Sequence, residues 1–270
     1  MEFKMMMKKS IFKNLIFTLL PFFLFDGCDK NDMDPLPCLI MSSTSTGGGY
    51  TYVHNLVYDN RKAVSGINTS QTPNGSTTQN VTYAYNDAGN LSEIVYSSSV
   101  REVFTYTNGE ITKKETFNNS KLTDQTDYEY TKEQLTKIQE YKLTSGTTSL
   151  EKGVYQTFEF ATPSDTNPVR AQYFNSPGST VPANTSELTY GEQKGAFAAA
   201  PAGLLKYFKT NGQSTDKAIS KQVILSAGPT QTITYAYESN ADGFPTTRIE
   251  TYSIGLLQRA TTYTYQCDKK

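Results

Sequence analysis

The side chains that could support catalysis are few and scattered in this chain of 270 residues. His54 is its one histidine, which excludes a site with several histidine ligands and a mechanism that uses two histidines within one chain. The favoured explanation of His54 is a polar residue in an early strand. The sequence has no phosphate-binding loop and no nucleophile elbow. We therefore predict that the protein is not an enzyme and uses no cofactor and no metal.

Paired carboxylates are the one catalytic chemistry that stays open. Four glutamates lie in or beside candidate strands: Glu93, Glu102, Glu129 and Glu159. Two of them at the right separation could act as a glycosidase-type acid and base, but that separation is a property of the fold. The solvated face of a sheet explains the same residues. A carboxylate-pair hydrolase is therefore kept as an alternative.

Tyrosine is the most repetitive of the side chains that could bind a ligand. The chain has 19 Tyr and 14 Phe but no Trp. Seven tyrosines recur at equivalent positions: Tyr83, Tyr85, Tyr106, Tyr128, Tyr130, Tyr235 and Tyr237. In adjacent strands they would form columns on one face of a sheet. Such columns either make the core of a curled sheet or line a concave groove, where rigid amphipathic rings suit a glycan or an extended peptide.

These tyrosines belong to a hairpin unit that is clearest over residues 81–96. Tyr83 and Tyr85 are two residues apart, so their side chains share one face of an extended strand. Residues 86–90 supply the Asn, Asp and Gly of a chain reversal, and a strand rich in β-branched residues follows. The unit repeats with aliphatic residues at +6 and +9 after the tyrosine before the turn. Two copies show this spacing: Tyr58, Val64, Ile67 and Tyr85, Leu91, Ile94.

Seven hairpins and a last strand predict an all-β, water-soluble protein with an antiparallel up-and-down meander of about 14–15 strands. A sheet of that width twists and curls, so we expect a barrel or an open half-barrel. Two longer insertions break the repeat, a Pro-bearing loop before Val169 and an Ala-rich segment before residues 204–208. We expect a short helix over 195–205 and a strand at 204–208, and these insertions are where function is best sought.

The first 27 residues have the pattern of an export signal. Lys8, Lys9 and Lys13 precede an apolar run over 15–25, which is too short to span a bilayer comfortably. The run ends in Leu24-Phe-Asp-Gly-Cys28, which resembles a bacterial lipobox. The resemblance implies lipidation at Cys28 and a place in the cell envelope, at the outer membrane on its periplasmic or surface face. Ordinary secretion and a retained anchor are the alternatives.

The mature chain divides into a tether and one domain. We expect residues 28–49 to form a flexible acidic and Ser/Gly-rich linker, and residues 50–267 to form a repeat-built β domain. If Cys28 carries lipid, Cys38 and Cys267 remain as an even pair in an oxidising compartment. A disulfide between them would join the two ends of the folded region, although two free thiols fit the sequence as well.

A family resemblance rests on the repeat. The pattern Tyr-x-Tyr-Asn-Asp-x-Gly-Asn-Leu that begins at Tyr83 resembles YD-type repeats. With the lipobox and repeats over roughly residues 50–267, the chain resembles a Bacteroidota lipoprotein family of unknown function with a porin-like fold. The resemblance implies that fold, but it implies no activity and no site residues.

Charge separates the remaining classes of function. Lys113, Lys114 and Glu115 lie within a candidate strand, and a Lys facing lipid costs about 2–4 kcal/mol at mid-bilayer, which disfavours a pore. Without residues 1–27 the chain has 21 basic and 24 acidic residues, a net charge of −3, so nucleic acid is not an expected partner.

We predict a monomeric binding module for a glycan, peptide or envelope protein, which meets the membrane only through its lipid. The alternative is a structural or adhesion spacer that pairs with a partner through exposed sheet edges.

Overall fold

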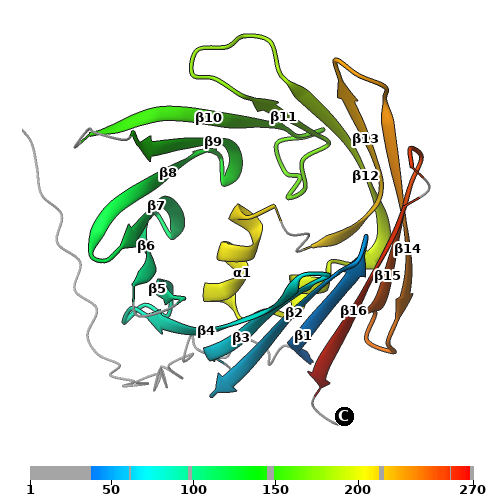
Figure 1. The fold of residues 1–270 in the computed structure, drawn as a ribbon, viewed down its shortest axis with the longest axis horizontal. Coiled ribbons are helices and arrows are strands. Elements are labelled where there is room, and N and C mark those ends of the chain that lie inside the picture. Colours follow the sequence, from blue (N-terminus) through cyan, green and yellow to red (C-terminus); the bar gives the residue numbers. More distant parts are fainter. Residues whose placement is uncertain are drawn as a thin grey trace, which may run out of the picture. The chain divides into compact units, whose positions relative to one another are not determined.

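The computed structural model describes residues 38–60, 62–96, 99–144, 149–212, 216–255 and 257–267. The predicted signal peptide, the predicted lipidation site Cys28 and residues 28–37 of the predicted linker lie outside these ranges. The described residues form an all-β unit with one short α-helix, as the sequence predicted (Figure 1).

Sixteen strands make up the described sheet. They are β1 (Cys38–Gly47), β2 (Tyr50–Asp59), β3 (Lys62–Thr72), β4 (Gly75–Tyr85), β5 (Leu91–Val95), β6 (Val100–Thr107), β7 (Glu110–Asn118), β8 (Lys121–Thr131), β9 (Gln134–Leu143), β10 (Leu150–Glu159), β11 (Arg170–Phe174), β12 (Asn184–Lys194), β13 (Lys217–Ser226), β14 (Gln231–Ser239), β15 (Pro245–Tyr252) and β16 (Gln258–Cys267). Between β12 and β13 lie a 3-10 helix, η1 (Ala196–Ala199), and an α-helix, α1 (Ala202–Thr210).

The sheet is a closed barrel rather than an open half-barrel. Each strand pairs antiparallel with its sequence neighbours, and β1 pairs with β16 to complete the ring. Every described strand therefore has a neighbour on both sides. The exposed sheet edges on which the spacer alternative relied are not present among these strands, so that part of the prediction is wrong.

The prediction of a flexible linker is wrong from Cys38 onward. The Ser and Thr residues of this segment form β1, which hydrogen-bonds to β16 on one side and to β2 on the other. The composition predicted a segment with high chain entropy. Pairing with strands on both sides orders the segment instead, because its backbone N–H and C=O groups gain hydrogen-bond partners. This strand raises the count to sixteen from the predicted 14–15.

A disulfide lies at the point where the barrel closes. Cys38 and Cys267 stand directly opposite each other in the β1–β16 ladder, and the structure joins them 229 residues apart in sequence. Asp242 lies beside the two sulfur atoms. Because the sulfurs are bonded to each other, they do not act as thiolate ligands, and this cluster is not a metal site in the oxidised protein.

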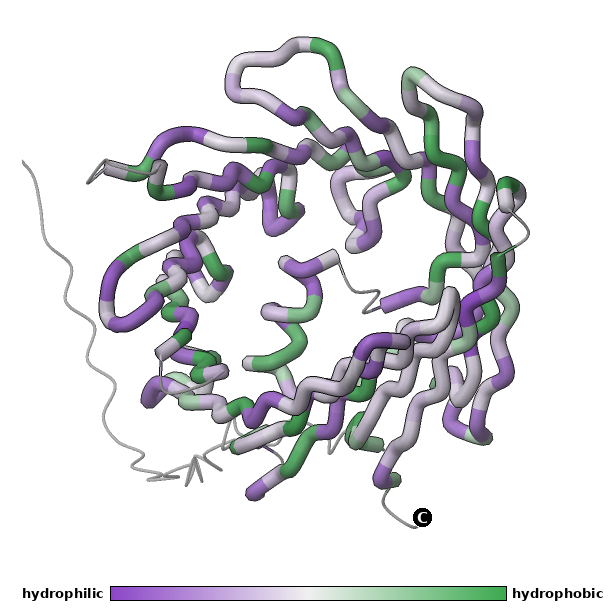
Figure 2. Tube along the Cα trace, in the orientation of Figure 1, coloured by the Kyte–Doolittle hydropathy of each residue, from purple (hydrophilic) through white to green (hydrophobic). Residues whose placement is uncertain are grey.

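Strand alternation decides which side chains face the lumen. Tyr83 is opposite Ile94 and belongs to the buried cluster that includes residues of α1. Residues of the other parity face outward, and Figure 2 shows hydrophilic and hydrophobic positions alternating along the strands. The outward face carries ion pairs: Arg101–Glu93 at 2.8 Å, Lys137–Glu129 at 2.7 Å and Arg170–Glu159 at 3.5 Å.

The repeated turns are chain reversals fixed by asparagine. Asn86 Oδ1 accepts a hydrogen bond from the backbone N–H of Asn90, and Gly89 adopts a positive φ of 77°. In the equivalent turn after β14, Asn240 Oδ1 accepts from the backbone N–H groups of Asp242 and Phe244. The side-chain amides thus satisfy the turn backbone, which explains their recurrence without a ligand.

A tyrosine near the end of several strands links neighbouring hairpins. Its hydroxyl donates to a backbone carbonyl within two residues of the start of the preceding strand. The donors and acceptors are Tyr58 to Ile40, Tyr106 to Leu91, Tyr190 to Pro168, Tyr237 to Ile219 and Tyr265 to Pro245, all at 2.6–2.9 Å. Phenylalanine could fill the same space but could not make this bond, so the repeat selects tyrosine.

The helix α1 lies within the ring of strands (Figure 1). The short helix expected over 195–205 is present as η1 and the start of α1, but residues 204–208 continue as helix rather than strand. Leu204 and Phe208 are one turn apart, so both bury on the same face of α1 against the barrel core. None of the helices in the described residues is long and apolar enough to cross a membrane.

Close contact fixes α1 against the turn end of the barrel. A Cβ atom added at Gly203 would lie 2.5 Å from the backbone oxygen of Gly89, so only glycine permits this approach. Lys206 Nζ also donates a hydrogen bond to the backbone oxygen of Gly109. Two repeated turns therefore hold the inserted helix.

Candidate ligand-binding site

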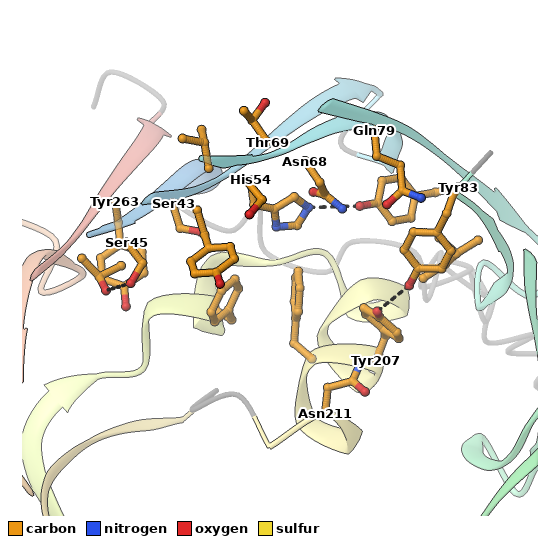
Figure 3. A pocket seen from close by; sticks show the side chains of 18 of the residues that line it. Ser43, Ser45, His54, Asn68, Thr69, Gln79, Tyr83, Tyr207, Asn211 and Tyr263 are labelled. Carbon is orange, nitrogen blue, oxygen red and sulfur yellow. Dashed lines mark hydrogen bonds between the residues drawn. The ribbon is translucent and has the colours of Figure 1, made fainter. Parts of the chain in front are cut away.

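Between α1 and one side of the barrel wall lies a chamber of about 530 Å³, which we call the polar chamber. Its wall comes from β1–β5, β15 and β16, and its floor from η1 and α1 (Figure 3). Aromatic rings line it from both sides: Tyr52, Tyr83, Tyr96, Tyr207, Phe208 and Tyr263. Hydroxyl and amide groups fill the positions between them: Ser43, Ser45, Asn68, Gln79, Asn211 and Thr261.

His54 lies on this wall and is held by aromatic neighbours. Its Nε2 atom is 3.2 Å from the Tyr83 hydroxyl, and its ring meets Phe208 edge-on with centroids 6.4 Å apart. Burial lowers the pKa of His54 below its ordinary value of 6.5, because the charged ring would be desolvated. Among the described residues Tyr83 is its one hydrogen-bond partner. A neutral imidazole without an orienting carboxylate suits ligand binding better than proton transfer.

A second polar group joins the wall to the helix. The hydroxyls of Tyr96 and Tyr207 are 3.1 Å apart, and the Tyr96 hydroxyl also donates to Glu102 Oε2 at 2.8 Å. Lys114 Nζ lies 3.1 Å from the other oxygen of Glu102, which compensates the inward carboxylate. Burial raises the pKa of Tyr207 to about 12 and also raises that of Tyr96. Both phenols therefore remain protonated hydroxyls at neutral pH.

An arginine cluster completes the opposite side. Arg248 Nη2 lies 2.6 Å from Glu250 Oε1, and the Tyr252 hydroxyl donates to the other oxygen of Glu250 at 2.7 Å. Arg248 also donates to Thr261 Oγ1 at 3.4 Å, which in turn donates to Ser45 at 3.1 Å. The charges cancel within the cluster, so the chamber is polar without a net charge from this group.

Two atoms of the chamber wall have no hydrogen-bond partner within the described chain. These are the acceptor Asn68 Oδ1 and the donor Arg248 Nε, and both are buried. Buried polar atoms are almost always paired. Tyr85 Oη and Arg170 Nε, which lie outside the chamber lining, are unpaired as well, so the two chamber atoms mark polar positions in the wall and do not by themselves define a ligand.

The predicted tyrosine ladder does not act as one surface. Tyr83 lines the polar chamber, whereas Tyr106 and Tyr237 are occupied by backbone carbonyls and Tyr235 donates to Gln222 at 2.8 Å. Tyr128 is buried in the core, and Tyr85 and Tyr130 pack against it. The expected open groove is a chamber closed by α1, and core packing accounts for most of the repeated tyrosines.

The glutamates proposed as a carboxylate pair are not brought together. Glu93, Glu129 and Glu159 face outward, each in an ion pair with a basic residue, and only Glu102 faces the lumen. A retaining or inverting glycosidase needs two carboxylates about 5–10 Å apart across one ligand. This combination of glutamates does not supply them.

Sequence reasoning missed most of the chamber. Asn68, Gln79 and Arg248 have the same strand parity as the inward tyrosines, a signal that was available once the register was known. Tyr207 lies on the inserted helix and Asn211 caps its C-terminus, and only the break in the repeat marked this segment in the sequence. One of the two predicted interruptions of the repeat forms η1 and α1, which line the chamber.

The fold has close counterparts among solved structures. A porin-like protein from Bacteroides uniformis superimposes with a TM-score of 0.59 at 15% identity, covering 86% of this chain and 98% of that chain. A porin-like protein from Bacteroides vulgatus has a TM-score of 0.55 at 12% identity, with 84% and 98% coverage. The chain thus has a porin-like β-barrel fold. No protein-family model matches the sequence, and no curated protein matches it.

Proposed function

We propose that this protein is an exported, lipid-anchored binding protein of the bacterial cell envelope, and that its polar chamber takes a small glycan. The observation that carries the proposal is the chamber itself, in which aromatic rings alternate with hydroxyl and amide groups. Sugars present apolar C–H faces to rings and hydroxyls to such groups. The volume of about 530 Å³ lies within the usual range of ligand pockets, about 300–1,000 Å³.

The polar groups of the wall favour a glycan over an apolar ligand. A sugar carries several hydroxyls, each of which can donate and accept, so different hydroxyls can meet the Asn68 side and the Arg248 side of the chamber. An extended peptide fits less well, because α1 forms a floor where a peptide would need to continue. The protonated tyrosines and the neutral His54 are binding groups in this arrangement, and we propose no catalytic step.

Export and anchoring rest on the sequence, since the lipobox-like segment ends at Cys28. The outward ion pairs support a barrel that faces water, because an Arg or Lys facing lipid would cost about 2–4 kcal/mol each at mid-bilayer. The lumen is also occupied by α1, which disfavours an open channel.

Lipidation is tested by expressing variants in cells that incorporate labelled palmitate. The Cys28→Ala variant should carry no label, whereas the Cys38→Ala variant should still be labelled. Label retained on Cys28→Ala would contradict lipidation.

The glycan proposal is tested with a matched pair of asparagines. Asn68 faces the chamber, whereas Asn80 on the adjacent strand faces outward, opposite Ile67. The mature protein is screened on a glycan array, and hits are measured by titration calorimetry and by the rise in melting temperature. We expect Asn68→Ala to weaken binding roughly tenfold and Asn80→Ala to leave it unchanged. Absence of any glycan hit, or equal losses in both variants, would contradict the proposal.

A further inference from the structure

A second chamber of about 310 Å³ lies between α1 and the opposite side of the barrel, and we call it the apolar chamber. Its wall comes from β9–β13 and the loop after β10. Strand register places Phe158 opposite Ala171 and Leu188 opposite Gln222, and all four belong to the lining. The chamber is therefore a second part of the lumen, separate in its lining residues from the polar chamber.

Apolar side chains dominate the body of this chamber. They are Leu135, Phe158, Phe160, Ala171, Leu188 and Ile219. The loop that carries Phe160 is fixed in place, because Gln134 Nε2 donates to the backbone oxygens of Thr162 and Asp165 at 2.9 and 2.8 Å. At its far end the Tyr190 hydroxyl donates to Pro168. The interrupted repeat thus builds a preformed apolar wall.

Three uncharged polar side chains of this wall, those of Gln222, Ser186 and Tyr190, are paired within the protein. Gln222 donates to Ser186 Oγ at 3.0 Å and accepts from the Tyr235 hydroxyl at 2.8 Å. The Tyr190 hydroxyl is bonded to the loop, as described above. Unlike Asn68 and Arg248 in the polar chamber, these groups make no demand for a ligand rich in hydroxyls.

Lys209 is the exception. It lines the apolar chamber from α1, is partly buried, and its ammonium group makes no ion pair or hydrogen bond with any residue that the structure describes. A cation beside apolar surface is stabilised by a counter-anion, since desolvation without a partner costs free energy. A single cation matches a single negative charge.

We infer that the apolar chamber binds a small monocarboxylate with an apolar tail or ring. The carboxylate would pair with Lys209, and the hydrocarbon would replace water along Phe158, Leu188 and Ile219. The volume of about 310 Å³ restricts the ligand to a short or medium chain, too small for a membrane lipid with two acyl chains. A dianion such as a phosphate monoester fits less well, because one cation faces it.

The first experiment uses octanoate as the probe, with octan-1-ol as the uncharged analogue. Binding to the mature protein is measured by titration calorimetry and by the shift in melting temperature. We expect octanoate to bind and octan-1-ol to bind roughly tenfold or more weakly, the usual effect of losing a charged hydrogen bond. Octanoate that does not bind, or octan-1-ol that binds equally well, would overturn the inference.

Three variants then locate the charge. Lys209→Met should weaken octanoate binding roughly tenfold or more, whereas Lys209→Arg should retain most of it because the positive charge stays. Lys221→Met is the matched control, since Lys221 is exposed and of opposite parity to the lining residue Gln222. Equal loss in Lys209→Met and Lys221→Met would overturn the inference, as would unchanged binding in Lys209→Met.

A filling variant locates the hydrocarbon independently of charge. Ala171→Leu adds bulk to the chamber wall while leaving Lys209 in place, and its folding is checked by circular dichroism. We expect a folded protein with octanoate binding reduced at least tenfold. A folded Ala171→Leu protein that binds octanoate as the wild type does would place the ligand elsewhere and overturn the inference. Should that variant not fold, Ile219→Asn makes the same wall polar and should also reduce octanoate binding, and unchanged binding in that variant would overturn the inference.

Discussion

The polar and apolar chambers lie on different sides of α1 and differ in chemistry, although both walls come from one repeated hairpin. The polar chamber has unpaired hydrogen-bonding atoms in Asn68 and Arg248, whereas the apolar chamber pairs Gln222 and Tyr190 within the protein and leaves Lys209 without a partner among the described residues. The turns and the hydrogen bonds from tyrosine hydroxyls to backbone carbonyls set the spacing of the hairpins. The inward residues farther from the turns can therefore differ from one hairpin to the next. A single repeat can therefore build two unlike sites.

The inserted segments account for the rest of the difference. The helix α1 presents Tyr207, Phe208 and Asn211 to the polar chamber and Lys209 to the apolar chamber. Because side chains along a helix point in directions about 100° apart, neighbouring residues serve opposite sides. Changes to the helix should affect both chambers, and changes to one wall should affect one.

The largest expected effect is at the β1–β16 closure. Replacing both Cys38 and Cys267 by serine removes a crosslink over 229 residues, which the chain-entropy model values at about 5 kcal/mol. Urea unfolding should show this loss. Because β1 and β16 line only the polar chamber, glycan affinity should fall while octanoate affinity in the folded fraction persists. Equal loss of both ligands would show that the closure supports the whole barrel uniformly.

A smaller effect on stability, but one shared by both chambers, is expected at Gly203. In Gly203→Ala the new Cβ would lie 2.5 Å from Gly89 O, so α1 must shift, at a cost of about 1–3 kcal/mol. Both the glycan and octanoate should bind more weakly. Gly228→Ala is the control, because a Cβ there meets only Ser226 Oγ at 3.7 Å. If only one ligand were affected, α1 would not be a common wall.

A tyrosine pair separates stability from binding. Tyr207→Phe removes the hydroxyl contact with Tyr96 in the polar chamber. Tyr106→Phe removes the hydrogen bond from its hydroxyl to the backbone oxygen of Leu91, which lies outside both chambers. Each should lower the free energy of unfolding by about 0.5–1.5 kcal/mol. Only Tyr207→Phe should weaken glycan binding, and neither should alter octanoate binding. A glycan effect of equal size in Tyr106→Phe would contradict a local role for Tyr207.

The smallest effect expected is the pH dependence from His54. Its pKa is below 6.5 in the folded protein, so between 6.5 and that lower pKa the unfolded chain binds a proton that the folded protein does not. Stability should therefore fall as the pH drops below 6.5, and the slope should flatten in His54→Gln. Lys209→Met should keep the wild-type slope. An unchanged slope in His54→Gln would contradict burial of this ring.

The repeat made much of the fold predictable. The pairs Tyr83 and Tyr85, the turn at 86–90 and the +6 and +9 spacing indicated antiparallel hairpins, and the number of copies required curling. These signals are local, because side-chain alternation and turn chemistry act over a few residues. Strand β1 escaped prediction for the converse reason. Its Ser and Thr residues pair with β2 across the Gly48-Gly49 turn and also with β16, and this second partner lies more than 200 residues away.

The sequence by itself predicted an export signal, an all-β repeat of hairpins and a shared face for its tyrosines, since each prediction depends on residue type and short spacing. The tertiary structure decided that the sheet closes, that α1 enters the lumen and that the interior divides into two chambers. Those outcomes depend on contacts between distant segments, such as Gly203 against Gly89, which no local pattern encodes. The tyrosines that first suggested a binding ladder mostly hold the barrel together, and the binding that we propose involves Asn68, Arg248 and Lys209 between and beside them.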